Sequence, residues 1–314
     1  MMLRHEGNHI GDSWYFVKDG VCHCYYLTCP ETVERHTAWD IAHAVSTDLV
    51  HWENQGIVLR KGEGDSWDQN CLSTGSVIEY RGRYWMAYTG QWNSLSGKIG
   101  LAVSDDLYTW EKTKDNPILT PVDSMFSETG RGLRKFSHWR DPDLSVMDGQ
   151  VYGLICATSR TAPEDACGSV AVCRSRDMSH WEIAGELKIE AVCQELECPQ
   201  VYKLNGKYYL LFSSFYDLFS EDMKRKYGKK LRQTSYCMMA DDFWGPYRFV
   251  PDFSILPDDC EDICQNVQYA NRLVFWKGQW YITGTVWSDQ GDYIADFREI
   301  RLDKEGWLHA GNTE

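Results

Sequence analysis

The chain has 314 residues, of which 43% are hydrophobic and 14% aromatic, and it carries a formal net charge of −14 at pH 7. This length and apolar content suffice for a large core, whereas the acidic balance argues against nucleic acid or an anionic membrane surface as partner, since both require a basic face. No apolar run is long enough for a membrane-spanning helix, and the first residues lack the apolar segment of a signal peptide, so we expect a cytoplasmic protein.

The twelve cysteines predict neither a disulfide framework nor a zinc site. They are scattered along the chain without a CxxC pair, and Cys260 and Cys264 form a lone CxxxC pair. Structural zinc sites usually combine two closely spaced ligand pairs. The simpler interpretation is reduced thiols packed as small hydrophobic groups. We therefore expect no metal and no cofactor.

Five stretches of the chain share one layout, in which a turn residue and a glycine precede a run of aromatic and β-branched residues. They are DGVCHCYYL from Asp19, RGRYWMAYTG from Arg81, DGQVYGLICA from Asp148, NGKYYLLFSS from Asn205 and KGQWYITGTV from Lys277. A residue–glycine pair in this setting is typical of a tight β-hairpin. The sequence therefore predicts five hairpins, spaced at similar intervals along the chain.

A second unit follows most of these hairpins, with a strand that runs into a Ser/Asp turn and a short strand bearing tryptophan. It reads HAVSTDLVHWE from His43, LAVSDDLYTWE from Leu101 and AVCRSRDMSHWE from Ala171, with more distant copies from Cys237 and Arg298. Each repeat thus holds about four strands. Such repeats predict an all-β fold, a five-bladed β-propeller with four short antiparallel strands per blade, and a single domain over residues 1–314.

Five residues hold equivalent positions in the five repeats. Counted back from the turn glycine, they lie eight residues away (Asp12, Thr74 and Asp141) or nine residues away (Glu197 and Tyr269). The innermost strand of each blade lines the propeller axis, so these side chains should converge. Singly, Asp12 could cap a turn, Asp141 could pair with Arg140, and Glu197 could face water. Because unpaired buried charge is costly, three carboxylates in register favour a functional site.

Converging carboxylates indicate glycoside chemistry. One carboxyl group protonates the leaving oxygen, and a second attacks the anomeric carbon or activates water. Tryptophans can stack on sugar rings, and four of the fourteen lie near strand entrances or loops. These candidates are Trp39, Trp67, Trp92 and Trp287.

The motifs WRDPDL, ECPQVY, AHAVSTDLVHWE and DQNCLSTGSV resemble those of glycoside hydrolase family 32, which contains invertases, inulinases and levanases. That family shares clan J and a five-bladed propeller with family 68, and family 43 is a more distant relative. The resemblance covers nearly the whole chain. It implies that Asp12 is the nucleophile, Glu197 the general acid/base and Asp141 the transition-state stabiliser. Arg140 would hold sugar hydroxyls and tune the acid.

The chain also departs from that family. The stretch HIGDSWYFVKDG keeps Asp12 but lacks the asparagines and the proline of the family's first motif, and Thr74-Gly75-Ser76 stands where the family has Ser-Gly-Ser. We expect Thr74, Ser76 and Tyr269 to help bind substrate. The family's C-terminal β-sandwich is not expected, because the chain ends at Glu314. This pattern is typical of a divergent, propeller-only member.

These features predict a retaining glycoside hydrolase that acts on a small furanoside by a β-fructofuranosidase-type reaction, with a small carbohydrate as its partner. One alternative is a family 43-like arabinofuranosidase or xylosidase, which would invert and use Asp12 as a base. Another is a non-catalytic sugar-binding propeller. The separation of the two carboxyl groups distinguishes retention from inversion. The sequence predicts no oligomeric state.

Overall fold

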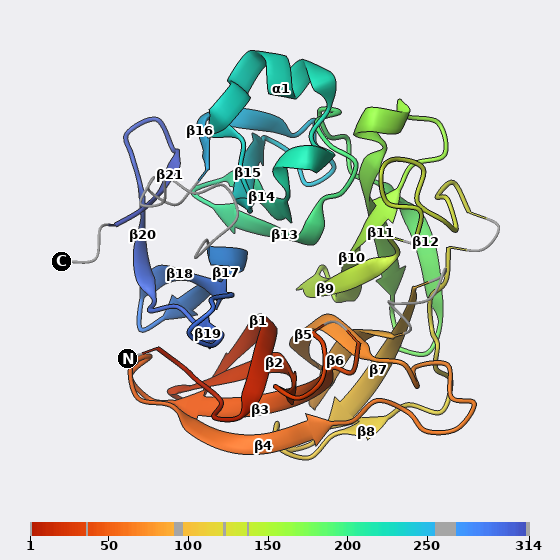
Figure 1. The fold of residues 1–314 in the computed structure, drawn as a ribbon, viewed down its shortest axis with the longest axis vertical. Coiled ribbons are helices and arrows are strands. Elements are labelled where there is room, and N and C mark those ends of the chain that lie inside the picture. Colours follow the sequence, from red (N-terminus) through yellow and green to blue (C-terminus); the bar gives the residue numbers. More distant parts are fainter. Residues whose placement is uncertain are drawn as a thin grey trace.

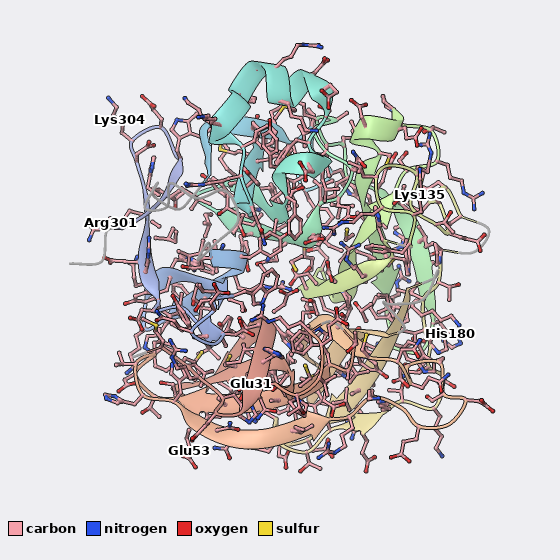
Figure 2. The ribbon with its side chains drawn as sticks, viewed as in Figure 1. Glu31, Glu53, Lys135, His180, Arg301 and Lys304 are labelled. Carbon is pink, nitrogen blue, oxygen red and sulfur yellow. The ribbon has the colours of Figure 1, made fainter. Side chains whose placement is uncertain are left out.

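The computed structural model describes residues 2–35, 37–90, 97–121, 124–136, 138–254 and 268–311. Within these residues, five antiparallel sheets stand around a central axis as the blades of a propeller (Figure 1). The predicted all-β, five-bladed fold is confirmed. Charged side chains at the periphery, such as Glu53, Lys135 and Lys304, point away from the ring (Figure 2).

The strands follow one another from the axis outward in every blade. Blade one contains β1 (Asn8–Lys18), β2 (Val21–Pro30), β3 (Asp40–Ser46) and β4 (Glu53–Leu59). Blade two contains β5 (Leu72–Tyr80), β6 (Arg83–Gly90), β7 (Lys98–Ser104) and β8 (Glu111–Lys112). Blade three contains β9 (Arg140–Met147), β10 (Gln150–Thr158), β11 (Gly168–Ser175) and β12 (Trp181–Glu186).

The last two blades contain additional short elements. Blade four contains β13 (Glu197–Leu204), β14 (Lys207–Ser214), β15 (Thr234–Ala240) and β16 (Arg248–Ser254). Helix α1 (Glu221–Tyr227) lies between β14 and β15, and Ser220 caps it by accepting the amide of Met223. Blade five contains β17 (Gln268–Trp276), β18 (Gln279–Val286), β20 (Arg298–Leu302) and β21 (Leu308–Ala310), and β19 (Tyr293–Ile294) pairs with β18. Short 3-10 turns span Tyr216–Leu218 and Gly228–Lys230 in blade four, and another spans Glu164–Ala166 in blade three.

The five predicted hairpin turns join the first two strands of each blade. Asp19 and Gly20 have φ angles of 48° and 77°, and the other four pairs also have positive φ at both residues. This conformation matches the twist of the flanking strands, and glycine adopts it without a side-chain clash. The local sequence therefore sets the register of each inner hairpin.

The Ser/Asp unit builds a second recurring turn, between the third and fourth strands of three blades. In blade one, Ser46 Oγ accepts the amide of Leu49, and Asp48 accepts the amides of Val50 and His51. The same pattern occurs at Ser104 and Asp106 and at Ser175 and Asp177. Small polar side chains that bond to nearby amides stabilise such turns.

Apolar side chains fill the spaces between neighbouring blades. Trp14 and Tyr25 of blade one, for example, share a cluster with Met86 and Tyr88 of blade two. The ring closes where Leu3 pairs with Ile294 of blade five. Nearer the axis, buried Arg272 of β17 forms an ion pair with Asp143 of β9 at 3.0 Å and donates to the Gly75 carbonyl of β5 at 3.3 Å.

Each innermost strand is irregular near the predicted site. The strand pairing shifts between Ile10 and Ser13 in blade one, and shifts of the same kind occur in the other four blades. Asp141, Cys198 and Ala270 adopt φ angles of 59°, 51° and 50° at these shifts. Bulges of this kind redirect side chains, and left-handed conformations at residues other than glycine tend to occur at functional sites.

Ten of the twelve cysteines lie in the described residues, and all ten are buried. Cys260 and Cys264 lie outside those residues. Among the helices of the described segments, none has the length and apolar character needed to cross a membrane.

Candidate active site

A cavity of about 790 Å³ lies at the axis, near the beginning of the innermost strands. The five residues that the repeat register singled out all line it: Asp12, Thr74, Asp141, Glu197 and Tyr269. Each comes from a different blade, so the radial arrangement of the innermost strands brings together residues that are far apart in the chain.

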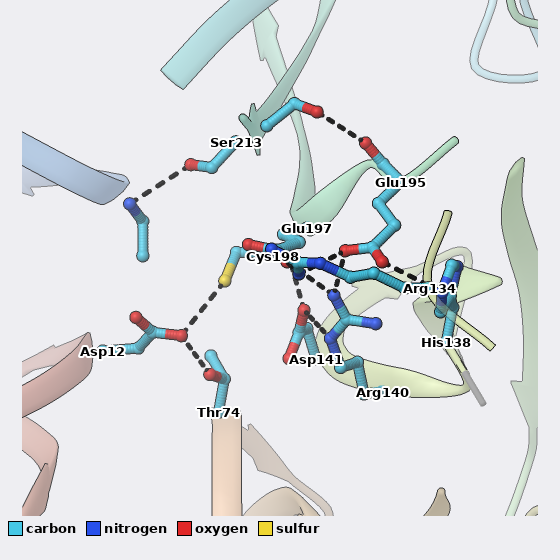
Figure 3. Close-up of polar contacts among 12 residues, drawn as sticks. Asp12, Thr74, Arg134, His138, Arg140, Asp141, Glu195, Glu197, Cys198 and Ser213 are labelled. Carbon is cyan, nitrogen blue, oxygen red and sulfur yellow. Dashed lines mark hydrogen bonds and ion pairs between the residues drawn. The ribbon is translucent and has the colours of Figure 1, made fainter. Parts of the chain in front are cut away.

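Asp12 of β1 is half-buried and accepts hydrogen bonds from two other blades (Figure 3). Its Oδ2 accepts the Thr74 hydroxyl at 2.5 Å and the Cys198 thiol at 3.5 Å. These contacts fix the direction of the carboxyl group in the cavity.

Asp141 is buried at the start of β9, where its positive φ turns the side chain toward the axis. Its Oδ2 accepts the amide of Cys198 at 3.0 Å and lies 3.5 Å from Arg140 Nε. Burial raises the pKa of Asp141, the Arg140 charge offsets part of this, and the nearby Asp12 charge adds to the rise.

Glu197, the first residue of β13, lies against two arginines and a tyrosine. Its Oε1 is 2.7 Å from Arg140 Nη2 and 3.2 Å from Arg134 Nη1, and its Oε2 accepts the hydroxyl of Tyr269. Burial raises the pKa of Glu197 to about 8, with a contribution from the neighbouring Glu195 charge that the two arginines oppose. A carboxyl group with this pKa carries a proton at neutral pH and can donate it to a leaving group.

Glu195 is a fourth carboxylate of this cluster, which the register argument did not find. Its side chain is fully buried, and its Oε1 lies 2.9 Å from His138 Nε2. Burial alone would raise the pKa of Glu195, but the charges of Arg140 and His138 outweigh burial and hold it well below its ordinary range. The sequence offers one signal, because residues two apart on an extended chain share a face, and Glu195 precedes Glu197 by that spacing.

Arg134, Phe136 and Phe215 also line the cavity and were not predicted. The guanidinium of Arg134 lies 4.6 Å from the centre of the Phe215 ring. All three residues lie in connections between strands. No repeat or turn signal marks these connections, so sequence reasoning had no register with which to place them.

Two of the four candidate tryptophans line the cavity. Trp39 is almost fully buried there. The ring of Trp287 packs against the ring of Tyr269 with the two centres 5.6 Å apart and the planes tilted by 37°, and its indole N–H donates to the Ile10 carbonyl. The cavity therefore has an aromatic wall next to its carboxyl groups, as expected of a sugar site.

The structure places two other candidates away from this wall. The Ser76 hydroxyl accepts the Leu144 amide at 2.8 Å and so joins blades two and three. Trp67 stacks on Tyr88 at 5.7 Å, within the core between blades one and two. Neither is among the residues that line the cavity. Trp92 lies outside the described residues.

Two more arginines line the cavity, Arg4 of the segment before the first blade and Arg35 of the first blade. Arg35 binds both oxygens of buried Asp292, which also contacts His9. In the described part of the chain, no group of three or more His, Cys, Asp or Glu side chains is placed to hold a metal ion.

The model of the glycosyl hydrolases family 32 N-terminal domain matches residues 12–293. The chain belongs to glycosyl hydrolase family 32. The resemblance inferred from WRDPDL and ECPQVY is thus confirmed.

The chain is also similar to a sucrose-6-phosphate hydrolase of Pediococcus pentosaceus, 26% identical over 202 residues. That alignment covers 62% of this chain and 36% of the relative, so the chain spans about a third of the length of this relative. Two solved structures share the fold. An inulosucrase from Halalkalicoccus jeotgali bound to kestose has a TM-score of 0.78 at 19% identity, with 99% of this chain and 90% of that chain covered. A sucrose-6-phosphate hydrolase from Lactobacillus gasseri has a TM-score of 0.75 at 19% identity, with 96% and 61% covered.

Proposed function

We propose that this protein is a retaining glycosidase that hydrolyses a small fructofuranoside. The observation that carries the proposal is the convergence of Asp12, Asp141 and Glu197 on one cavity, in a chain of family 32. Their surroundings differ enough to give each carboxyl group a different task.

Glu197 is the general acid. Its raised pKa, about 8, keeps the carboxyl group protonated at neutral pH, and its place in the cavity lets it reach the glycosidic oxygen. After the fructosyl group has been transferred, the same carboxylate removes a proton from the water that releases the sugar.

Asp12 is the nucleophile. It lines the cavity, and hydrogen bonds from Thr74 and Cys198 orient its carboxylate for attack on the anomeric carbon. Attack forms a covalent fructosyl ester while the leaving-group oxygen takes the proton of Glu197, and hydrolysis of the ester gives retained configuration.

Asp141 holds the sugar. The amide of Cys198 and the guanidinium of Arg140 fix its Oδ2, so the carboxyl group is rigid where it meets the sugar hydroxyls. Hydrogen bonds to those hydroxyls that strengthen in the transition state contribute several kcal/mol in enzymes of this type.

The cavity volume of about 790 Å³ lies in the range of small-molecule sites and accommodates a short saccharide. The relatives named above include sucrose-6-phosphate hydrolases, and Arg4, which lines the cavity, offers positive charge to a phosphate. Sucrose, sucrose 6-phosphate and short fructosides are therefore the first substrates to compare.

The test is a hydrolysis screen of these fructosides beside aryl fructofuranosides, arabinofuranosides and xylosides. NMR of the first product that forms gives the stereochemistry. Turnover of a fructoside with retention is expected. Turnover restricted to arabinofuranosides or xylosides with inversion would replace the proposal with the family 43-like reaction. Calorimetric binding of sugars without any turnover would replace it with a sugar-binding propeller.

A further inference from the structure

Glu195 and Glu197 share the same two guanidinium nitrogens (Figure 3). Arg140 Nη2 lies 2.8 Å from Glu195 Oε2 and 2.7 Å from Glu197 Oε1. Arg134 Nη1 lies 3.1 Å and 3.2 Å from the same two oxygens. The four side chains form a closed square of alternating cations and carboxyl groups.

The two carboxyl groups of the square differ in access to substrate. Glu197 lines the cavity, whereas Glu195 is fully buried behind it and is not among the lining residues. The backbone of Glu195 is also anchored, because its carbonyl accepts the hydroxyl of Ser214 at 3.1 Å. Glu195 therefore cannot take part in proton transfer to a sugar.

The charges explain why a second carboxylate is needed. Two arginine cations in direct contact with a general acid would favour its ionised form and so remove the proton that it must donate. A fixed anion on the same two nitrogens opposes this effect, both by neutralising the cations and by repelling a second negative charge.

We propose that Glu195 is a positioning residue: it is the resident counter-anion of Arg134 and Arg140, and it leaves Glu197 free to carry the catalytic proton. The proposal rests on the function proposed above. The charged and titratable groups around the pair are Arg134, His138, Arg140, Cys156, Cys193, Cys198 and Tyr269, with Asp141 next to Arg140. The direction of the two pKa shifts, up for Glu197 and down for Glu195, agrees with this division.

The experiment replaces the anion with a neutral isostere, Glu195→Gln, and measures the pH dependence of kcat/KM. A general acid acts while it is protonated, so activity falls as pH rises through its pKa. In E195Q the arginines face Glu197 alone. We therefore expect the basic limb of the pH profile, where activity falls as pH rises, to shift to lower pH by about one unit or more. At neutral pH, a fructoside with a poor leaving group should lose more activity than an activated aryl fructoside.

A double variant separates this electrostatic effect from a structural one. Arg134→Gln together with E195Q removes one cation along with the anion, and the basic limb should move back toward that of the wild type. The matched control is Glu182→Gln, which should leave the pH profile unchanged. Glu182 lies on β12, the outer strand of blade three, and forms an exposed ion pair with Arg174.

Difference infrared spectroscopy detects whether Glu197 is protonated, and it needs no turnover. The wild type at neutral pH should show a protonated carboxyl band that Glu197→Gln abolishes, and E195Q should weaken the same band. If E195Q does not fold, the pH profile and the infrared spectrum are both measured on the double variant, which should retain the band.

The proposal is overturned if folded E195Q keeps the basic limb and the infrared band of the wild type. It is also overturned if the basic limb of the double variant lies at no higher pH than that of E195Q. A wild type that hydrolyses no fructoside would contradict the proposed function instead. The infrared comparison would then still decide where the proton lies.

Discussion

At the scale of single residues, environment rather than residue type separates the carboxyl groups of the cavity. Glu197 is buried against another carboxylate, and its pKa is raised to about 8. Asp12 is half-buried and accepts hydrogen bonds from Thr74 and Cys198. The first environment favours a proton donor and the second an oriented nucleophile, which leads to two predictions.

The first prediction concerns proton donation. Glu197→Gln should lower kcat/KM for sucrose or short fructosides by about 10²–10⁴-fold, since general acid catalysis contributes about this factor. An activated aryl fructoside needs little help from an acid, so its first step should be nearly unaffected. Steady-state rates on the two substrate types provide the check, and equal losses on both would contradict the acid role.

The second prediction concerns the nucleophile. Asp12→Asn keeps the shape of the side chain but removes the attacking charge, so activity should fall by several orders of magnitude. Because the change also removes a negative charge close to Asp141, the melting temperature should be equal or higher, and sugar binding should persist. Near-native activity of this variant on the best substrate would exclude Asp12 as the nucleophile.

At the scale of elements, blade one contains a buried pair of histidines on neighbouring strands. His23 of β2 and His43 of β3 stack at 5.1 Å and share a hydrogen bond of 3.0 Å. Tyr25 and Tyr108 also pack on His43. Burial lowers the pKa of His23 to about 4 and that of His43 to about 3 from the ordinary value of 6.5, with Asp106 opposing the second shift.

This pair should make the stability of the protein depend on pH. Unfolded histidines bind protons near pH 6.5, whereas the folded pair binds them only near pH 4 and below, so the unfolded state takes up more protons in between. The free energy of unfolding should therefore fall by up to a few kcal/mol as pH drops from about 6.5 to about 4. Urea unfolding at several pH values measures this slope. His23→Gln together with His43→Gln should flatten it, and an unchanged slope would show that other groups cause it.

Another element-scale prediction concerns the irregular start of β5. A Cβ atom at Gly75 would lie 2.1 Å from the carbonyl oxygen of Ala87 on β6, which neither strand can accommodate without moving. Gly75→Ala should cost about 1–3 kcal/mol of stability and disturb the neighbouring Thr74. Gly153→Ala on β10, where the nearest atom is a Leu144 methyl group at 3.3 Å, is the control and should cost less. Chemical denaturation of both variants tests the difference.

At the scale of the whole molecule, the ring is tied across its axis by the Arg272–Asp143 ion pair between blades five and three. Burial raises the pKa of Asp143 to about 6, and Arg272 offsets part of that rise. Arg272→Met would leave the partly buried Asp143 carboxylate without its cation. Breaking a fully buried pair costs about 3–5 kcal/mol, so the cost here should lie at or below the lower end of that range. We expect a lower melting temperature, partly restored by adding Asp143→Asn. A melting temperature close to that of the wild type would show that the axial pair contributes little to stability.

The sequence by itself determined the number of blades, their hairpin turns and the level at which Asp12, Thr74, Asp141, Glu197 and Tyr269 lie. These features follow from local rules. A residue–glycine pair sets the turn, strand alternation sets the face, and repetition carries the same register into every blade. A count back from each turn glycine could therefore find the cavity residues before any contact was known.

Only the tertiary structure decided how the carboxyl groups differ. Arg134 and His138 come from a connection without periodicity, and Glu195 acquires its role through contacts with them. Tertiary contacts also direct Ser76 and Trp67 into the packing between blades. Burial and charge at one carboxyl group depend on everything that packs around it. The groups around Glu197 come from blades three and five and from the connections before β9 and β13. No local pattern in the sequence could therefore encode its proton affinity.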